Sequence, residues 1–252
     1  MSAIELLYGQ RSGDTVGLNA TTLDLSSRGE VSLPAVEIHY CLFELPMAHM
    51  LPRLPESLHP SIPAILGITV WRCSAGPLGP FSLAWIGLAC RTGIKPRHFI
   101  HSAFCDNEEV GRWFKSRYGF PCQTALVHSL ETYDRIHSRV ELEGTPILDL
   151  ETHRLQPLVG LGAMVKYSPP LNPARLENGV ALVQMEATFE FMRVARGVPH
   201  APTYAAAALG DDSLRPVYAV SGTFAVANIG LHPPRFSLSP RLPAEQGGAK
   251  KI

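Results

Sequence analysis

The sequence predicts a mainly β fold, either a barrel or a sandwich, with a few short helices. Glycine (21 residues) and proline (22 residues) are spread along the 252-residue chain, so they separate many short segments instead of forming one linker. Residues 180–194 alternate apolar and polar side chains, which is the repeat of a half-buried strand. Other runs are rich in β-branched and aromatic residues, and so many strands require a barrel or a sandwich to cover their edges.

The other expected strands are runs of β-branched or aromatic residues bounded by turn residues. The first thirty or so residues carry no clear pattern and are left unassigned. In chain order, the expected strands are residues 36–43, 65–72, 81–90, 97–103, 124–128, 133–142, 158–167 and 217–227.

Two segments predict helices. Residues 46–50 form a short one that ends in a Leu-Pro pair. Residues 107–118 form a longer one, with Asp106 as the expected N-cap, Glu109 as its capping-box partner and Gly119 as the stop. The longer helix carries a group of basic residues.

Length and composition favour one domain. With 46% hydrophobic and 17% charged residues, a chain of this size buries a substantial core. We expect residues 1–236 to form this domain and residues 237–252, which contain Pro, Gly and Lys, to form a flexible tail.

Charge and cysteine usage exclude several classes of partner. The 22 basic residues balance the 22 acidic ones, so neither nucleic acid nor a membrane surface is an expected partner. The N-terminus lacks a signal-peptide pattern, and the apolar runs are too short to span a bilayer, so we expect a cytoplasmic protein. No C-x-x-C pair occurs, and His98 and His101 would point to opposite faces of a strand, so no metal site is expected.

Several motifs, taken in order, resemble the acetoacetate decarboxylase superfamily. The resemblance depends on their order and spacing over roughly residues 36–236, because each motif alone is weak. The motifs are Leu54-Pro55-Glu56-Ser57-Leu58, Gly79-Pro80-Phe81, Gly119-Phe120-Pro121, Leu182-Val183-Gln184-Met185-Glu186, Arg196-Gly197-Val198-Pro199, Val217-Tyr218-Ala219-Val220-Ser221-Gly222-Thr223, Asn228-Ile229-Gly230-Leu231 and Pro234-Arg235.

This resemblance implies an antiparallel β-barrel that encloses a small-molecule pocket and assembles into a homo-oligomer. It also implies a lyase without a cofactor, in which a buried lysine forms an imine with a small keto acid or β-dicarbonyl substrate. The position of the nucleophile falls on Ser116, one residue after Lys115, and the position of the second lysine falls on Arg117. Lys115 is therefore the expected catalytic amine, with Arg117 and Arg112 as its electrostatic neighbours.

Two further positions depart from the family pattern. Leu83 stands where the pattern has a pocket carboxylate, and Glu44 stands near the position of the arginine that receives the substrate carboxylate. An acid there would repel a keto acid, so the substrate is expected to be bulkier or less acidic than acetoacetate. Glu44 is the candidate proton-transfer group. The expected substrate-binding residues are Arg112, Ser116, Trp71, Phe81, Leu83 and Glu186.

Each of these roles has a structural alternative. Lys115 and Arg117 lie in the last turn of the expected helix, where cations meet the negative end of the helix dipole. Glu44 and Glu186 could face water. The whole protein could likewise be a non-catalytic small-molecule-binding barrel that has lost the imine-forming lysine, because a mostly apolar pocket still binds ligands. Whether the protein is an enzyme is left open by the sequence.

Overall fold

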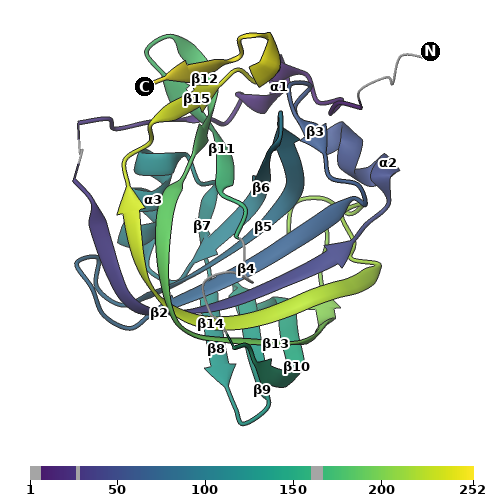
Figure 1. The fold of residues 1–252 in the computed structure, drawn as a ribbon, viewed down its shortest axis with the longest axis vertical. Coiled ribbons are helices and arrows are strands. Elements are labelled where there is room, and N and C mark those ends of the chain that lie inside the picture. The colour runs from purple at the N-terminus through teal and green to yellow at the C-terminus, as the bar shows by residue number, and fades with distance from the viewer. Residues whose placement is uncertain (1–6, 27–28, 160–166) are drawn as a thin grey trace.

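The computed structural model describes residues 7–26, 29–159 and 167–252. Within these ranges sixteen strands form one continuous sheet in which most neighbouring strands are antiparallel. Helices are few and short, as the sequence predicts. Figure 1 shows the long strands curling around a common interior. The prediction of a mainly β barrel is confirmed.

The barrel closes because one stretch of chain contributes to both ends of the strand order. Strands β12 and β13 are separated by a single residue, Met185, so they continue one another. β12 pairs with β11, and β13 pairs with β14. The ring therefore runs β2, β4, β5, β6, β11, β12/β13, β14 and back to β2. Its strands are β2 (Val31–Glu44), β4 (Ile65–Cys73), β5 (Phe81–Thr92), β6 (Lys95–Cys105), β11 (Pro170–Leu176), β12 (Gly179–Gln184), β13 (Glu186–Tyr204) and β14 (Tyr218–His232).

A smaller layer covers the outer face of this ring. It consists of β8 (Leu126–Glu131), β9 (Arg135–Leu142) and β10 (Thr145–Pro157). The layer is joined to the ring by β13, because the first half of β13 pairs with β14 and its second half pairs with β10. Side chains alternate between the faces of a strand, so the ring strands contribute to two hydrophobic cores. One lies between the ring and the outer layer, and the other lies inside the barrel.

Paired glycines allow the outer layer to approach the ring. Gly197 on β13 and Gly222 on β14 lie directly opposite one another. A Cβ atom at Gly197 would lie 2.3 Å from the carbonyl oxygen of His153, and one at Gly222 would lie 2.4 Å from Oγ1 of Thr152. Both neighbours belong to β10, so only glycine fits at this crossing.

The longer predicted helix is present as α3 (Glu108–Tyr118). Its N-cap is Asn107, whose Oδ1 accepts hydrogen bonds from the backbone N–H groups of Glu109 and Val110. The expected cap, Asp106, instead accepts a 2.6 Å bond from the backbone N–H of Ser82. The helix ends at Gly119 as predicted, with φ of +75°. The apolar side of α3 packs into the inner core. The other helices are α1 (Gly13–Val16), α2 (Met47–Met50), η1 (Leu51–Arg53) and η2 (Ala244–Gln246).

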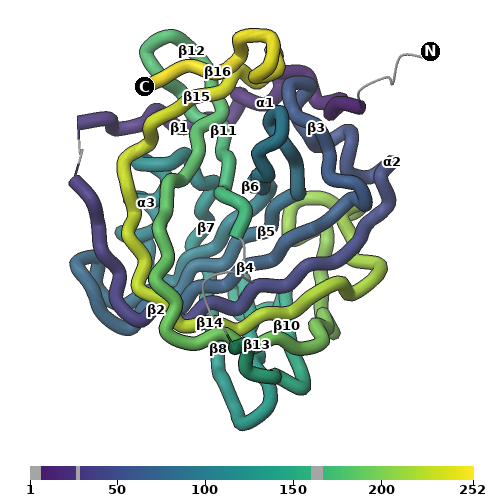
Figure 2. Tube along the Cα trace, viewed as in Figure 1, coloured from purple at the N-terminus to yellow at the C-terminus, as the bar shows by residue number. Residues whose placement is uncertain are grey.

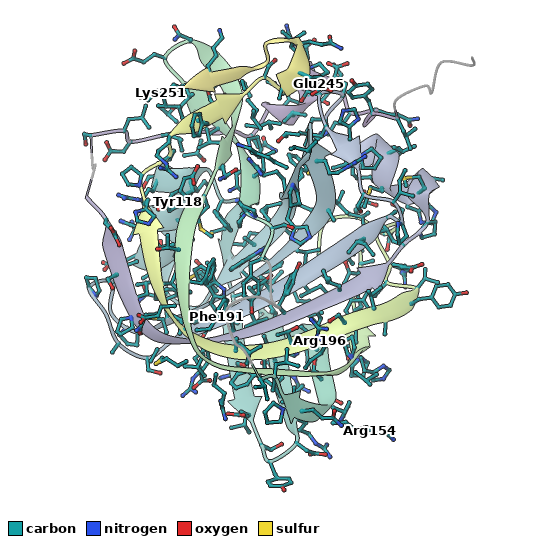
Figure 3. The ribbon with its side chains drawn as sticks, viewed as in Figure 1. Tyr118, Arg154, Phe191, Arg196, Glu245 and Lys251 are labelled. Carbon is teal, nitrogen blue, oxygen red and sulfur yellow. The ribbon has the colours of Figure 1, made fainter. Side chains whose placement is uncertain are left out.

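The first and last parts of the described chain meet at one end of the molecule (Figure 2). The expected tail, residues 237–252, takes part in the sheet there, because β15 pairs with both β12 and β16. Glu245 accepts hydrogen bonds from Tyr8 (3.0 Å) and from Nε2 of His59 (2.8 Å). Figure 3 places Glu245 and Lys251 at this end and Arg154 at the opposite one. The short strands are β1 (Thr21–Thr22), β3 (His59–Pro60), β7 (Cys122–Thr124), β15 (Phe236–Leu238) and β16 (Ala249–Lys251).

Most expected strands are observed with shifted bounds, but β11 (Pro170–Leu176) of the ring was not predicted. The run 180–194 is divided at Met185 into β12 and β13. The strand expected at 158–167 falls largely on residues 160–166, which lie outside the described residues, and β10 (Thr145–Pro157) was not predicted. Within the described residues, no helix is long and apolar enough to cross a membrane.

Candidate active site in the barrel

The barrel interior contains a cavity of about 110 Å³. This is several times the roughly 30 Å³ that one water occupies in the liquid and well below the volume of a drug-sized pocket. The cavity therefore suits a small molecule. Its described lining consists of Tyr40, Thr69, Trp71, Trp85, His98, Tyr167, Ser168, Pro169, Pro170, Met185, Ala187 and Phe189.

The strand register explains why these residues meet. Tyr40 on β2 lies opposite Thr69 on β4, and Thr69 lies opposite Trp85 on β5. Directly opposed residues share a face, and so do residues two positions apart on one strand. Gly67 and Gly87, which also oppose each other, therefore lie on this inner face. The two glycines leave space between the larger side chains.

The ring of His98, which is on β6, occupies that space. A Cβ atom at Gly67 would lie 2.9 Å from Cε1 and 3.1 Å from Nε2 of His98, and one at Gly87 would lie 3.2 Å from the His98 Cβ. His98 is 4% exposed. Burial lowers the pKa of its imidazole to about 4, so the ring is uncharged at neutral pH. Among the residues described, none forms a hydrogen bond with this ring.

Two phenols accompany the imidazole. The Tyr40 ring centroid lies 6.0 Å from that of His98 and 5.0 Å from that of Tyr167. Burial raises the pKa of both phenols above the usual value, so both remain protonated donors. The Tyr167 hydroxyl is buried and has no hydrogen-bond partner in the described part of the chain. A buried donor without a partner is costly, so a ligand oxygen that accepts from it would be stabilised.

The rest of the wall is apolar and aromatic. Trp71 contacts Trp85 and Phe189 edge to face, with centroids 4.9 and 6.2 Å apart. Phe189 also lies 5.2 Å from Tyr167. Such contacts hold large side chains in fixed orientations. The cavity is thus a rigid apolar space with a small number of uncharged polar groups.

The expected catalytic lysine is not part of this lining. Lys115 is exposed in the last turn of α3, and its carbonyl accepts the Gly119 N–H that ends the helix. Arg112, one turn earlier, is also exposed and lies 3.9 Å from Glu108 across one helical turn. Ser116 donates its hydroxyl to the carbonyl of Trp113 at 3.2 Å. These residues share the outer side of the helix, away from the cavity.

Arg117 is buried, with 4% exposure, but it serves the packing of the helix. Its guanidinium lies 5.1 Å from the Trp113 ring centroid and 5.6 Å from that of Tyr118. It donates hydrogen bonds to the carbonyl of Gly29 and to the Tyr118 hydroxyl. The cation is therefore held by aromatic faces and backbone on the side of α3 that packs into the inner core.

The two acids that the sequence singled out are separate from the cavity as well. Glu44 is half-buried at the end of β2, where its backbone carbonyl accepts from Val217 N–H at 2.8 Å. The Glu186 side chain is 12% exposed and lies 3.2 Å from an Arg235 nitrogen. Of the other expected binding residues, Trp71 lines the cavity, whereas Phe81 and Leu83 are buried in the inner core beside it.

His98, Tyr40 and Tyr167 were not identified from the sequence as site residues. The usable signal was a pair of glycines, Gly67 and Gly87, inside two strongly apolar strands, because a glycine there marks a close approach by another group. Recognising it requires the register of the two strands, which the sequence does not supply.

Alanine at Gly67 is expected to displace the His98 ring and lower the free energy of unfolding by about 1–3 kcal/mol, as overpacking does. Denaturant unfolding would measure the loss. Gly29→Ala is a matched control, because a Cβ atom there meets nothing within 4 Å. Equal effects of the two substitutions would contradict the close packing of His98 over Gly67.

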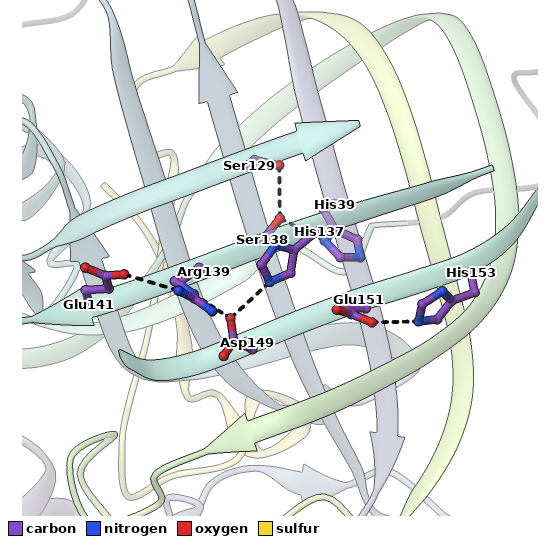
Figure 4. A network of polar contacts seen from close by, with 9 residues as sticks. All are labelled: His39, Ser129, His137, Ser138, Arg139, Glu141, Asp149, Glu151 and His153. Atoms are coloured by element: carbon purple, nitrogen blue, oxygen red, sulfur yellow. Dashed lines mark hydrogen bonds and ion pairs between the residues drawn. The ribbon is translucent and has the colours of Figure 1, made fainter. Parts of the chain in front are cut away.

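A second polar cluster is structural. His39, which is fully buried, bonds Ser138 through Nδ1 at 2.9 Å (Figure 4). Its Nε2 lies 2.8 Å from Oγ1 of Thr152 and 3.2 Å from Sγ of Cys41. Burial lowers the His39 pKa to about 3 and raises that of Cys41 to about 12. The thiol is therefore protonated and unreactive at neutral pH. The cluster joins the ring to the outer layer.

The outer face of that layer carries a separate set of contacts. Asp149 accepts from Nε of Arg139 at 2.7 Å and from Nε2 of His137 at 3.0 Å, and Glu151 lies 2.7 Å from His153 (Figure 4). No group of three or more His, Cys, Asp or Glu residues within the described ranges has a geometry that would hold a metal ion.

A larger groove of about 900 Å³ lies at the end of the molecule where β12, β15 and β16 meet. Charged residues of both signs, including Asp24, Glu177 and Lys250, line it together with backbone of the hairpin between β11 and β12. It lacks the convergent buried polar groups of the barrel cavity, so the barrel cavity is the better candidate for a site.

Comparison with known proteins identifies the fold. No protein-family model matches the sequence, and no curated protein matches it. An acetoacetate decarboxylase from Legionella pneumophila superposes with a TM-score of 0.71 at 16% sequence identity, covering 82% of this chain and 86% of that one. The enduracididine biosynthesis enzyme MppR, solved with pyruvate, gives 0.68 at 16% identity, covering 83% and 90%. An acetoacetate decarboxylase-like enzyme from Sphingomonas wittichii RW1 gives 0.64 at 10% identity, covering 84% and 93%. The resemblance predicted from the sequence motifs is confirmed at the level of the fold.

Proposed function

We propose that this chain, which has the acetoacetate decarboxylase fold, takes a small uncharged β-dicarbonyl or keto compound into its barrel cavity and acts on it as a cofactor-independent lyase. The observation that carries the proposal is the set of uncharged polar groups of His98, Tyr40 and Tyr167 around one small cavity. Similar folds belong to acetoacetate decarboxylases and to the enduracididine biosynthesis enzyme MppR, which was solved with pyruvate. Homo-oligomer assembly and a cytoplasmic location remain predictions from the sequence.

The charge state of the lining favours a neutral ligand. At neutral pH the imidazole of His98 is uncharged and both phenols are protonated. Burying an ionised carboxylate without a cation is strongly unfavourable, and the described lining contains no lysine or arginine. A β-dicarbonyl compound therefore fits this cavity better than a keto acid.

The chemistry that this arrangement supports is polarisation of a carbonyl group. Fixed, uncharged donors in a dry site stabilise the negative charge that develops on oxygen when an enolate forms, and a neutral imidazole is suited to this role. Such stabilisation assists cleavage of a bond at the carbon next to the carbonyl, because the electron pair of that bond is taken up in the enolate while the other fragment leaves without it.

A non-catalytic binding barrel is the second candidate. It is favoured by the aromatic wall of Trp71, Trp85 and Phe189, which suits retention of an apolar ligand. Turnover decides between the two. Loss of a dicarbonyl substrate in the presence of protein, followed by proton NMR, supports the lyase, whereas binding without any conversion supports the second candidate.

Reductive trapping tests whether a lysine takes part. We expect no ketone-sized increase in intact mass on Lys115 after borohydride treatment with a panel of β-diketones and β-keto acids, because this amine is exposed on α3. Lys115→Ala should leave ligand binding unchanged, whereas Tyr167→Phe should weaken it. An adduct that disappears in Lys115→Ala would restore the imine mechanism. Peptide mapping would assign any adduct among the five lysines of the sequence (Lys95, Lys115, Lys166, Lys250 and Lys251).

A further inference from the structure

The polar groups of the barrel cavity differ in what they can offer to a ligand. A neutral imidazole has one N–H donor and one nitrogen acceptor, whereas a protonated phenol donates through its single hydroxyl hydrogen. The imidazole of His98 makes no hydrogen bond with a described residue, and the Tyr167 hydroxyl has no described partner. The cavity therefore presents an acceptor and at least two donors that no described protein group satisfies.

This pattern complements one tautomer of a β-dicarbonyl compound. The enol form carries one hydroxyl donor and one carbonyl acceptor, whereas the diketone form carries two acceptors and no donor. Only the enol can donate to the free imidazole nitrogen while its carbonyl oxygen accepts from a phenol. The diketone offers no hydrogen to the acceptor nitrogen of His98, so it makes one hydrogen bond fewer than the enol.

We propose that the cavity selects the enol tautomer of its ligand, with His98, seated over Gly67, accepting the enol hydroxyl and Tyr167 donating to the carbonyl oxygen. The position of the imidazole supports this assignment, because the space left by Gly67 and Gly87 places the ring at the cavity wall. The ring centroids of His98 and Tyr40 lie 6.0 Å apart, and those of Tyr40 and Tyr167 lie 5.0 Å apart. Both phenols are therefore close enough to act on one small ligand. This inference rests on the proposed function and specifies its ligand.

Conversion of the diketone to its enol conserves atoms and electrons, so it needs no other reactant. A proton leaves the carbon between the two carbonyl groups, the C–H electron pair becomes the C=C bond, and a proton is gained on oxygen. The protein does not need to supply or remove electrons, since it binds the form that already exists in water. Its effect is to favour one of two populated forms by differential affinity.

Binding of 2,4-pentanedione and of its isomer 2,3-pentanedione tests the proposal. The two compounds contain the same atoms, but only the first exists to a substantial extent as an enol in water. Calorimetric titration is expected to give at least about tenfold tighter binding of 2,4-pentanedione, the effect of one or two net hydrogen bonds. Carbon-13 NMR of labelled 2,4-pentanedione should show the enol as the bound form, and the intact mass of the protein should not change.

Substitutions distinguish a hydrogen-bonding role of His98 from a general effect of its packing. His98→Gln keeps a donor and an acceptor and should retain the preference for 2,4-pentanedione, whereas His98→Phe and Tyr167→Phe should each reduce it towards equal affinity. Tyr167→Phe removes a single hydroxyl, so it reports on the proposal even if His98→Phe does not fold.

Other outcomes would overturn the inference in distinguishable ways. Equal affinity for the two isomers, or a bound diketone in the NMR spectrum, would remove tautomer selection and leave the proposed cavity function intact. A covalent adduct on a lysine would replace both with imine chemistry. If neither isomer binds, the proposed function is overturned as well.

Discussion

Gly197→Ala is expected to lower the free energy of unfolding by about 3 kcal/mol, or roughly 6–12 °C in Tm for a chain of this size. The added Cβ would lie 2.3 Å from the backbone oxygen of His153 and 2.8 Å from Cγ2 of Thr152. A backbone atom cannot rotate away as a side chain can, so β10 and β13 would have to separate. Urea unfolding monitored by far-ultraviolet circular dichroism would measure the change.

The matched control for this substitution is Gly29→Ala, because a Cβ atom at that position meets nothing within 4 Å. It should change stability by only a few tenths of a kcal/mol or raise it slightly, as glycine replacement restricts the unfolded chain. A Gly197→Ala variant as stable as the control would show that β10 does not cross β13 as closely as described. Gly222→Ala should act in the same direction through Thr152.

The fold could be predicted from the sequence where local signals are strong. The alternation over 180–194 marked β12 and β13, and Gly119 marked the end of α3. Both signals depend on the backbone and on nearest neighbours. β10 (Thr145–Pro157) was missed because shifts in its register interrupt the period-two pattern that the prediction relies on.

Most of the candidate site could not be predicted from the sequence, and the reason is physical. A period-two pattern separates two faces of a strand but does not say which face is enclosed by the barrel. His98 therefore had no feature that distinguished it from His101, and Tyr40 was one aromatic residue in an apolar run. Counting from family motifs placed the catalytic expectation on Lys115, which lies on the exposed side of α3. Trp71 was the one expected binding residue that lines the cavity.

Acidification should destabilise the protein strongly between pH 7 and pH 5. The pKa of His39 is lowered to about 3 and that of His98 to about 4, in both cases mainly by burial, whereas an unfolded histidine titrates near 6.5. The stabilisation from two buried neutral imidazoles is complete above the unfolded pKa and is lost as pH falls towards the folded pKa, because the unfolded chain takes up the protons first.

Each of these histidines should lose about 2 kcal/mol between pH 7 and pH 5, which gives about 4 kcal/mol for the pair. Burial also lowers the pKa of His101, which acts in the same direction. Urea unfolding at both pH values would measure the loss in the wild type and in His98→Gln, whose glutamine does not titrate. The variant should lose about 2 kcal/mol less than the wild type over this range, even if it is less stable at pH 7. An equal loss in both proteins would mean that the ring of His98 is not buried as a neutral group in the barrel, and the ligand contacts assigned to it would fall with that result.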